Sequence, residues 1–123
     1  MNILGIDYGK KRIGLAWVQV GLDVVLPFGV IEAKNAVEEI SKIVDSEKIN
    51  KIVCGLPLGL DGKENANTVA VRDFVAQLKN TIACPVEFLD ERFSSAAADR
   101  ILGDASRDEK AAMLILQMYI DRK

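Results

Sequence analysis

Short apolar runs separated by turn residues predict the strands of this chain. Residues 3–6 form a continuous apolar run, which is typical of a central strand buried on both faces. The segments 13–20 and 24–32 follow and are predicted to form a hairpin. Pro27 interrupts the second of them, which indicates an edge strand or an irregular one. Two more strands are predicted farther along, at 51–56 and 85–89.

Apolar residues at helical spacing, together with capping residues, predict four helices after the hairpin. The first follows Asn35, whose side chain we expect to cap it in a capping box with Glu38. The second covers residues 66–78. The remaining two are a third helix that runs from the N-cap Ser94 to Gly103 and a last helix that runs from the capping box Ser106–Glu109 to about Asp121.

The order of these elements predicts a single α/β domain over residues 1–123. Three antiparallel strands followed by alternating helices and strands indicate a mixed five-stranded sheet with helices on both faces. Because ligands bind at the carboxyl ends of the strands in such sheets, polar residues that directly follow a strand are the candidates for function.

The composition excludes several kinds of chemistry. Half of the 123 residues are hydrophobic and 28% are charged, as in a globular domain. There is no histidine, which excludes Ser-His-Asp and Cys-His catalysis and zinc sites with histidine ligands. Two cysteines are too few for a four-cysteine zinc site and suggest no disulfide framework.

Charge and hydropathy bear on the partners and the compartment. The net charge of −2 counts against a nucleic-acid-binding protein, for which a basic chain is expected, although a local basic patch can coexist with an acidic total. No apolar run approaches the length that spans a bilayer, so no membrane partner is expected. The first residues lack the pattern of a signal peptide, and we expect a cytoplasmic protein.

Acidic residues follow two predicted strands and open the last helix. Asp7 comes directly after the run 3–6, and Asp90 and Glu91 come directly after the run 85–89. Asp108 lies at the start of the last helix, in line with its apolar stripe. Each has a structural alternative: Asp7 as a turn residue, the Asp90–Glu91 pair as an exposed loop, and Asp108 as a first-turn acid. The neighbouring Glu109 is explained by the capping box.

If these acids converge, they predict a site for a divalent cation. Two carboxylates about 4 Å apart repel each other by roughly 4 kcal/mol at an effective dielectric constant of 20, and a cation relieves that repulsion. Oxygen ligands favour Mg²⁺ or Mn²⁺. Such sites hydrolyse phosphodiesters without a histidine base, which agrees with the composition. The basic turn Lys10, Lys11 and Arg12 beside Asp7 could contact phosphates, or could simply be solvated.

Several sequence blocks, in order along nearly the whole chain, resemble the YqgF family of RuvX-like Holliday junction resolvases. The resembling blocks are Gly5–Gly9 with Lys11–Ala16, then Gly55–Pro57, Asp61–Gly62, Val71–Arg72 and Phe74, then Asp90–Ser95, and in the last helix Asp108, Ala111–Ala112, Ile115–Gln117 and Tyr119.

This resemblance implies an RNase H-like fold and a nuclease that processes the precursor of small-subunit ribosomal RNA. By the resemblance, Asp7, the pair Asp90–Glu91 and Asp108 match the acidic active-site positions. We favour Glu91 over Asp90, so that Asp7, Glu91 and Asp108 form the expected metal-binding set. Two arginines, Arg72 and Arg92, match basic motif positions that would face phosphate.

Three functions from different classes remain open. The first is a metal-dependent nuclease whose partner is structured RNA, such as pre-rRNA within a ribosomal particle, or branched DNA as in a Holliday junction resolvase. The second is a nucleic-acid-binding ribosome-assembly factor with weak catalysis, which the low net charge and the short segment 103–107 favour. The third is a sugar-kinase-like ATP site, which the chain length argues against, because such enzymes close two domains around the nucleotide. The oligomeric state is left open.

Overall fold

The computed structural model of the chain describes residues 1–90 and 105–122. Five strands form one mixed sheet in the order β3-β2-β1-β4-β5. β1 pairs antiparallel with β2 and parallel with β4, so it lies at the centre of the sheet. The predicted mixed sheet is therefore confirmed, with these strands: β1 (Asn2–Asp7), β2 (Arg12–Gln19), β3 (Val25–Glu32), β4 (Lys51–Leu56) and β5 (Val86–Asp90).

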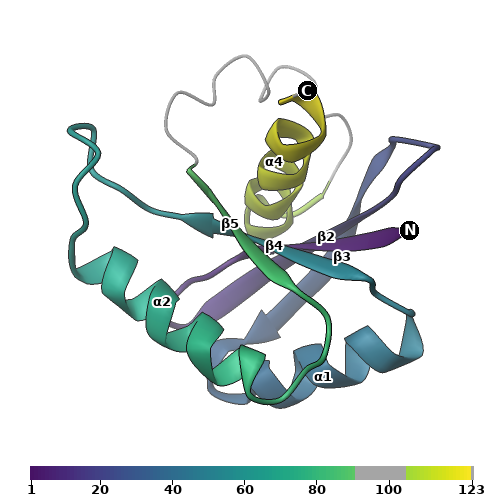
Figure 1. Cartoon of the computed structure of the whole chain (residues 1–123), viewed down its shortest axis with the longest axis horizontal. Helices are drawn as coiled ribbons and strands as arrows, with labels where there is room; N and C mark the ends of the chain where they lie inside the picture. Colours follow the sequence, from purple (N-terminus) through teal and green to yellow (C-terminus); the bar gives the residue numbers. More distant parts are fainter. Residues whose placement is uncertain (91–104, 123) are drawn as a thin grey trace.

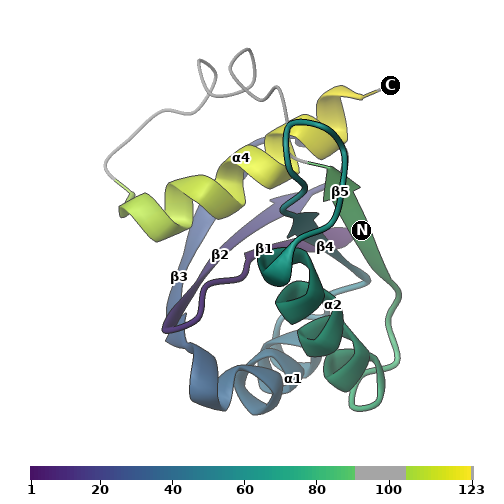
Figure 2. The ribbon, with the colours of Figure 1, turned by 90° about the vertical axis from the view of Figure 1, so that its left-hand side faces the viewer.

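Helices cover both faces of the sheet, as predicted. The helices α1 (Ala36–Ser46) and α2 (Ala66–Lys79) lie side by side on one face, and α4 (Arg107–Asp121) crosses the other face (Figures 1 and 2). A helix predicted from Ser94 to Gly103 lies outside the described residues. None of the helices within the described ranges is long and apolar enough to cross a membrane.

The pleat of the central strand divides the core into two layers. Leu4 and Ile6 of β1 are fully buried in the layer beneath α1 and α2. Ile3 alternates with them and is buried in the layer beneath α4, together with Ala112 and Leu116 of that helix. This alternation explains the continuous apolar run at the start of the chain, because a strand covered on both faces has no solvent-facing positions.

The strand β3 lies at one edge of the sheet, as Pro27 predicts. Its pairing with β2 shifts between Leu15 and Ala16, which face Gly29 and Pro27 respectively. The residue left without a register partner is Phe28, directly after the proline, which supplies no N–H to the ladder.

The helix N-termini confirm one of the predicted caps and correct another. Ser106 and Glu109 form the predicted capping box of α4. The Asn35 side chain makes no capping hydrogen bond, so the box predicted with Glu38 is wrong; a 3₁₀ turn, Ala33–Asn35, leads into α1 instead. A turn of this kind satisfies end groups with its own main chain. At α2 the structure has a capping box of Asn65 and Thr68 that sequence inspection did not identify.

Candidate active site at the start of helix α4

The structure brings Asp7 and Asp108 to the same place. Asp7 is the last residue of β1, and its register partner on β2 is Gly14. A Cβ atom on Gly14 would overlap the main-chain carbonyl of Asp108, so glycine is required for α4 to begin this close to the sheet. Because register partners point to the same side of a sheet, the Asp7 side chain lies on the face where α4 begins.

The surroundings of Asp7 oppose its negative charge. Burial of the carboxyl group, and next the nearby charge of Asp108, raise the pKa of Asp7 from 3.8 to about 6. Within the described part of the chain, the Asp7 carboxylate has no hydrogen bond or ion pair that would lower its pKa. Asp7 is thus a half-buried carboxyl group beside a second carboxylate, which is the electrostatic character expected of a cation site.

Arg12 lies beside Asp108 rather than Asp7. Its Nε donates a hydrogen bond of 3.1 Å to Oδ2 of Asp108. Asp108 therefore has an ion-pair partner, and among the described residues the Asp7–Asp108 site has one paired guanidinium for two carboxylates. Lys10 and Lys11, in the same turn, are exposed.

Of the two acids predicted to follow the strand at 85–89, Asp90 alone lies within the described residues. Asp90 is the last residue of β5 and pairs in register with Leu56, which is buried in the layer beneath α1 and α2. Asp90 is therefore on the opposite face of the sheet from Asp7 and Asp108. Glu91, the preferred acid of the pair, lies outside the described residues.

The predicted phosphate-binding arginines are not all near Asp7. Arg72 is on α2, which covers the face opposite α4, and its Nε and Nη2 donate to Glu64 at 2.8 and 2.9 Å. Its guanidinium also lies 5.3 Å from the centroid of the Phe88 ring. Arg92 lies outside the described residues.

The donor set suits a hard divalent cation. Asp7 and Asp108 supply carboxylate oxygens on one face, and such oxygens favour Mg²⁺ or Mn²⁺. Among residues 1–90 and 105–122, no group of three or more acidic, cysteine or histidine side chains is arranged to hold a metal. The described residues thus contribute two of the three predicted ligands.

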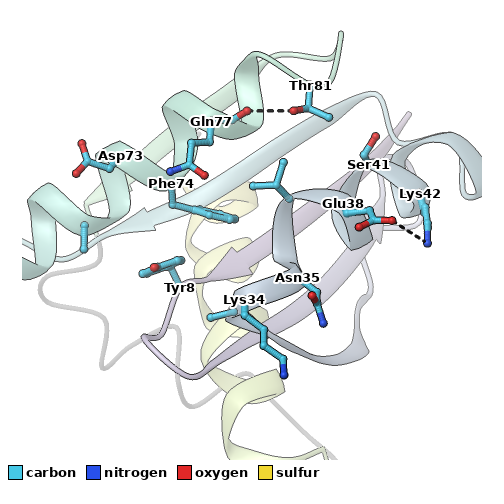
Figure 3. Close-up of a pocket in the computed structure, with 13 residues that line it drawn as sticks. Tyr8, Lys34, Asn35, Glu38, Ser41, Lys42, Asp73, Phe74, Gln77 and Thr81 are labelled. Carbon is cyan, nitrogen blue, oxygen red and sulfur yellow. Dashed lines mark hydrogen bonds and ion pairs between the residues drawn. The ribbon is translucent and has the colours of Figure 1, made fainter.

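A groove lies on the other face of the sheet, between α1 and α2 (Figure 3). Its volume is about 820 Å³. Tyr8 and Phe74 lie against each other in it, with ring centroids 4.8 Å apart, and polar side chains including Asn35, Ser41 and Gln77 surround them (Figure 3). Neither Asp7 nor Asp108 lines this groove, so it is distinct from the acidic site.

A second charged cluster lies beneath the C-terminal part of α4. Lys51 of β4 approaches Glu87 of β5 to 2.7 Å, and the Tyr119 hydroxyl donates to the same carboxylate at 2.9 Å. Arg122 contacts the other oxygen of Glu87 at 3.3 Å and covers the Tyr119 ring at 4.2 Å from its centroid. Hydrogen bonds from Lys51, then from Tyr119 and Arg122, lower the pKa of Glu87 to about 2.

Sequence reasoning missed the residues that place α4. Gly14 was not identified, because the contact that requires glycine there is made by a helix that begins more than ninety positions later. A glycine inside an apolar strand does suggest a close approach of another backbone, and that signal could have identified it. The Glu87 cluster joins residues from three elements and has no sequence signature.

Comparison with known proteins identifies the family. A family model described as "RuvX: Holliday junction resolvase" matches residues 1–122. The chain belongs to the RuvX family. A relative from Maridesulfovibrio salexigens, named "Putative pre-16S rRNA nuclease", is 37% identical, and the match covers 99% of each chain. A relative of the same name from Sulfurihydrogenibium sp. is 38% identical and is matched over 98% of this chain and 90% of its own length.

The similarity extends to solved structures. RuvC of T. thermophilus, in a complex with a Holliday junction substrate, superposes with a TM-score of 0.69 at 16% identity, covering 98% of this chain and 92% of RuvC. At that identity the similarity shows the fold, and it confirms the predicted RNase H-like class. Membership of the RuvX family also confirms the predicted enzyme class, a nuclease that hydrolyses phosphodiester bonds.

Proposed function

We propose that this RuvX-family protein is a divalent-metal-dependent nuclease that trims the 5′ end of pre-16S rRNA. The observation that carries the proposal is the convergence of Asp7 and Asp108 where β1 ends and α4 begins, with Asp7 held in surroundings that oppose its charge. The names of the relatives supply the RNA substrate. Structured RNA is the partner that this proposal requires.

Asp7 and Asp108 would hold the cation together with Glu91. The choice of Glu91 follows from the sequence and from the position of Asp90, which is on the other face of the sheet. When bound, Mg²⁺ or Mn²⁺ activates water and stabilises the leaving oxygen of the phosphodiester. Asp7 must release its proton to serve as a ligand, because carboxylates bind metal in the deprotonated form.

The basic turn beside these acids is placed to contact the nucleic-acid backbone. Lys10 and Lys11 are exposed next to Asp7, and Arg12 is already at the site through Asp108. Contacts of this kind are independent of sequence and weaken as the salt concentration rises. Arg92 is proposed as a fourth phosphate contact on the sequence alone. Arg72, engaged with Glu64, is better explained as a residue that stabilises α2.

The test is cleavage of end-labelled pre-16S rRNA by the wild type and by variants, with and without Mg²⁺ or Mn²⁺. A labelled four-way DNA junction is the parallel substrate, because the family description names such a resolvase. We expect metal-dependent trimming of the RNA, and we expect Asp7→Asn and Asp108→Asn to reduce it by roughly 100-fold or more, as for groups that stabilise the transition state.

Glu109→Gln is the matched control for Asp108→Asn. It removes one negative charge from the same helical turn, and glutamine can keep the capping box with Ser106. We expect it to cleave like the wild type. Cleavage that persists unchanged in Asp7→Asn and Asp108→Asn would refute the active site. Cleavage of the DNA junction without cleavage of the RNA would refute the proposed RNA substrate, while the proposal that the protein is a metal-dependent nuclease would stand.

A further inference from the structure

The ion pair between Arg12 and Asp108 joins two groups that the proposed reaction needs apart. Asp108 is a proposed ligand of the cation, and Arg12 is a proposed contact of the phosphate. In the structure the two are held together at 3.1 Å. A cation that binds Asp108 must compete with the Arg12 guanidinium. A phosphate that binds Arg12 must compete with the Asp108 carboxylate.

The ion pair between Arg12 and Asp108 is suited to an exchange of partners. The Arg12 side chain is 70% exposed and the Asp108 side chain 32% exposed, and ion pairs at such exposure contribute little net stability. Only Nε of Arg12 is engaged; within the described ranges, its two terminal nitrogens make no hydrogen bond or ion pair. A guanidinium with free terminal nitrogens can bind two oxygens of a phosphate at once.

We infer that Arg12 couples cation binding to phosphodiester binding by exchanging Asp108 for the phosphate, an inference that rests on the proposed function. Without ligands, Arg12 balances the charge of Asp108. A divalent cation at Asp108 releases the guanidinium, which then binds a phosphate of the nucleic acid. The cation therefore removes Asp108 as a competitor of the phosphate, and the phosphate removes Arg12 as a competitor of the cation. By linkage, each ligand raises the affinity of the protein for the other by the same factor. Arg12 acts here as a positioning residue.

The test is a thermodynamic cycle of binding, independent of cleavage. Mn²⁺ is titrated calorimetrically into the wild type, alone and saturated with a short RNA hairpin whose linkages are phosphorothioates, and the RNA is checked for integrity on a gel. The same cycle is run for Arg12→Gln, for Arg12→Lys and for Lys11→Gln. Lys11→Gln is the matched control, because it removes the neighbouring positive charge, which is exposed and has no ion pair among the described residues.

We expect saturation with RNA to raise the Mn²⁺ affinity of the wild type about 3- to 10-fold, within the range of ordinary coupling between sites. Arg12→Gln should bind Mn²⁺ several-fold more tightly than the wild type without RNA, and its coupling factor should fall close to one. Lys11→Gln should keep the coupling and change the affinity less. Arg12→Lys should keep part of the coupling, since lysine supplies the charge without the fork of donors.

Equal coupling in Arg12→Gln and the wild type would overturn the inference, as would an effect of Lys11→Gln as large as that of Arg12→Gln. Either result leaves the nuclease proposal standing if Mn²⁺ still binds and Asp108→Asn abolishes that binding. If the wild type binds no Mn²⁺, the proposed function and this inference fall together.

Discussion

Charged clusters lie beneath the two ends of α4, and they shift carboxyl pKa values in opposite directions. Beneath the start of the helix, Asp108 is paired with an exposed arginine, the neighbouring Asp7 has no ion pair among the described residues, and the pKa of Asp7 is raised to about 6. Beneath its C-terminal part, one carboxylate has a lysine, an arginine and a tyrosine hydroxyl, and the pKa of Glu87 is lowered to about 2. Among the described residues, the Glu87 carboxylate has three partners, whereas the Asp7–Asp108 site has two carboxylates and one paired guanidinium.

We interpret this difference as a division of roles: charged residues beneath one helix stabilise the fold where their charges are balanced, and we propose that they bind ligands where they are not. Glu87 and its partners attach α4 to β4 and β5. The Asp7–Asp108 site instead concentrates like charges, which costs stability and is typical of sites that bind ions or substrates. We therefore propose that the helix has a structural attachment at one end and the active site at the other.

The largest effect is expected from Gly14→Ala. The added methyl group would overlap the Asp108 carbonyl, so the start of α4 must move away from Asp7. We expect a loss of about 1–3 kcal/mol in the free energy of unfolding, as for other overpacked cores. Cleavage should fall by about 100-fold, because displacements of roughly 1 Å have that effect on catalysis. Chemical denaturation and the cleavage assay measure the two effects.

Gly59→Ala provides the control for Gly14→Ala. Its Cβ would meet chiefly the Asp61 carboxylate, at 2.9 Å, which is the movable end of a side chain. We expect a smaller loss of stability and normal cleavage. If Gly14→Ala behaves in the same way, the close approach of α4 at Asp108 is not what places the acidic site.

Asp7→Asn should stabilise the metal-free protein at neutral pH. Since the pKa of Asp7 is higher in the folded state than its ordinary 3.8, the ionised group destabilises the fold, and the stability present below about pH 4 is lost as the pH rises through about 6. After a discount for partial exposure, the substitution should gain about 1–2 kcal/mol at pH 8 and nothing at pH 4.

Denaturant unfolding in the presence of a chelator, at several pH values, measures this difference between Asp7→Asn and the wild type. Asp45→Asn, an exposed aspartate on α1, is the control for the loss of one charge. A lower stability of Asp7→Asn at pH 8 would show that Asp7 is a structural acid like Glu87.

Glu87→Gln should have the smallest effect and the opposite sign. Because the pKa of Glu87 is lower in the folded state than the ordinary 4.5, its ionised form stabilises the fold above that pH, and this stability is lost as the pH falls toward 2. The cluster is partly exposed, so we expect a loss of only about 0.5–1 kcal/mol at neutral pH. Thermal unfolding at pH 7 and pH 3 measures the change.

Glu47→Gln, on an exposed residue after α1, is the control for Glu87→Gln. Cleavage by Glu87→Gln should stay near the wild-type rate, because the other end of α4 is still placed by Gly14. If cleavage falls as far as in Asp108→Asn, the two ends of the helix do not have separate roles.

The elements, the class of sheet and the candidate acids could be predicted from the residues and their spacing. The continuous run at residues 3–6 predicted a strand covered on both faces, Pro27 predicted an edge strand or an irregular one, and Ser106 with Glu109 predicted a helix start. These are local rules, in which a few neighbouring residues decide the outcome. Asp7 and Asp108 could be named as candidates because each adjoins such an element.

The position and the partners of each acid depend on how the elements pack together. In the packed structure Asp90 lies on the opposite face of the sheet from Asp7, Asp108 pairs with Arg12, and Arg72 pairs with Glu64. The same packing brings α4 so close to β2 that glycine is needed at position 14. These outcomes depend on the facing of strands and on contacts between residues far apart in the chain, whose distances and burial are fixed only when the sheet and α4 pack together.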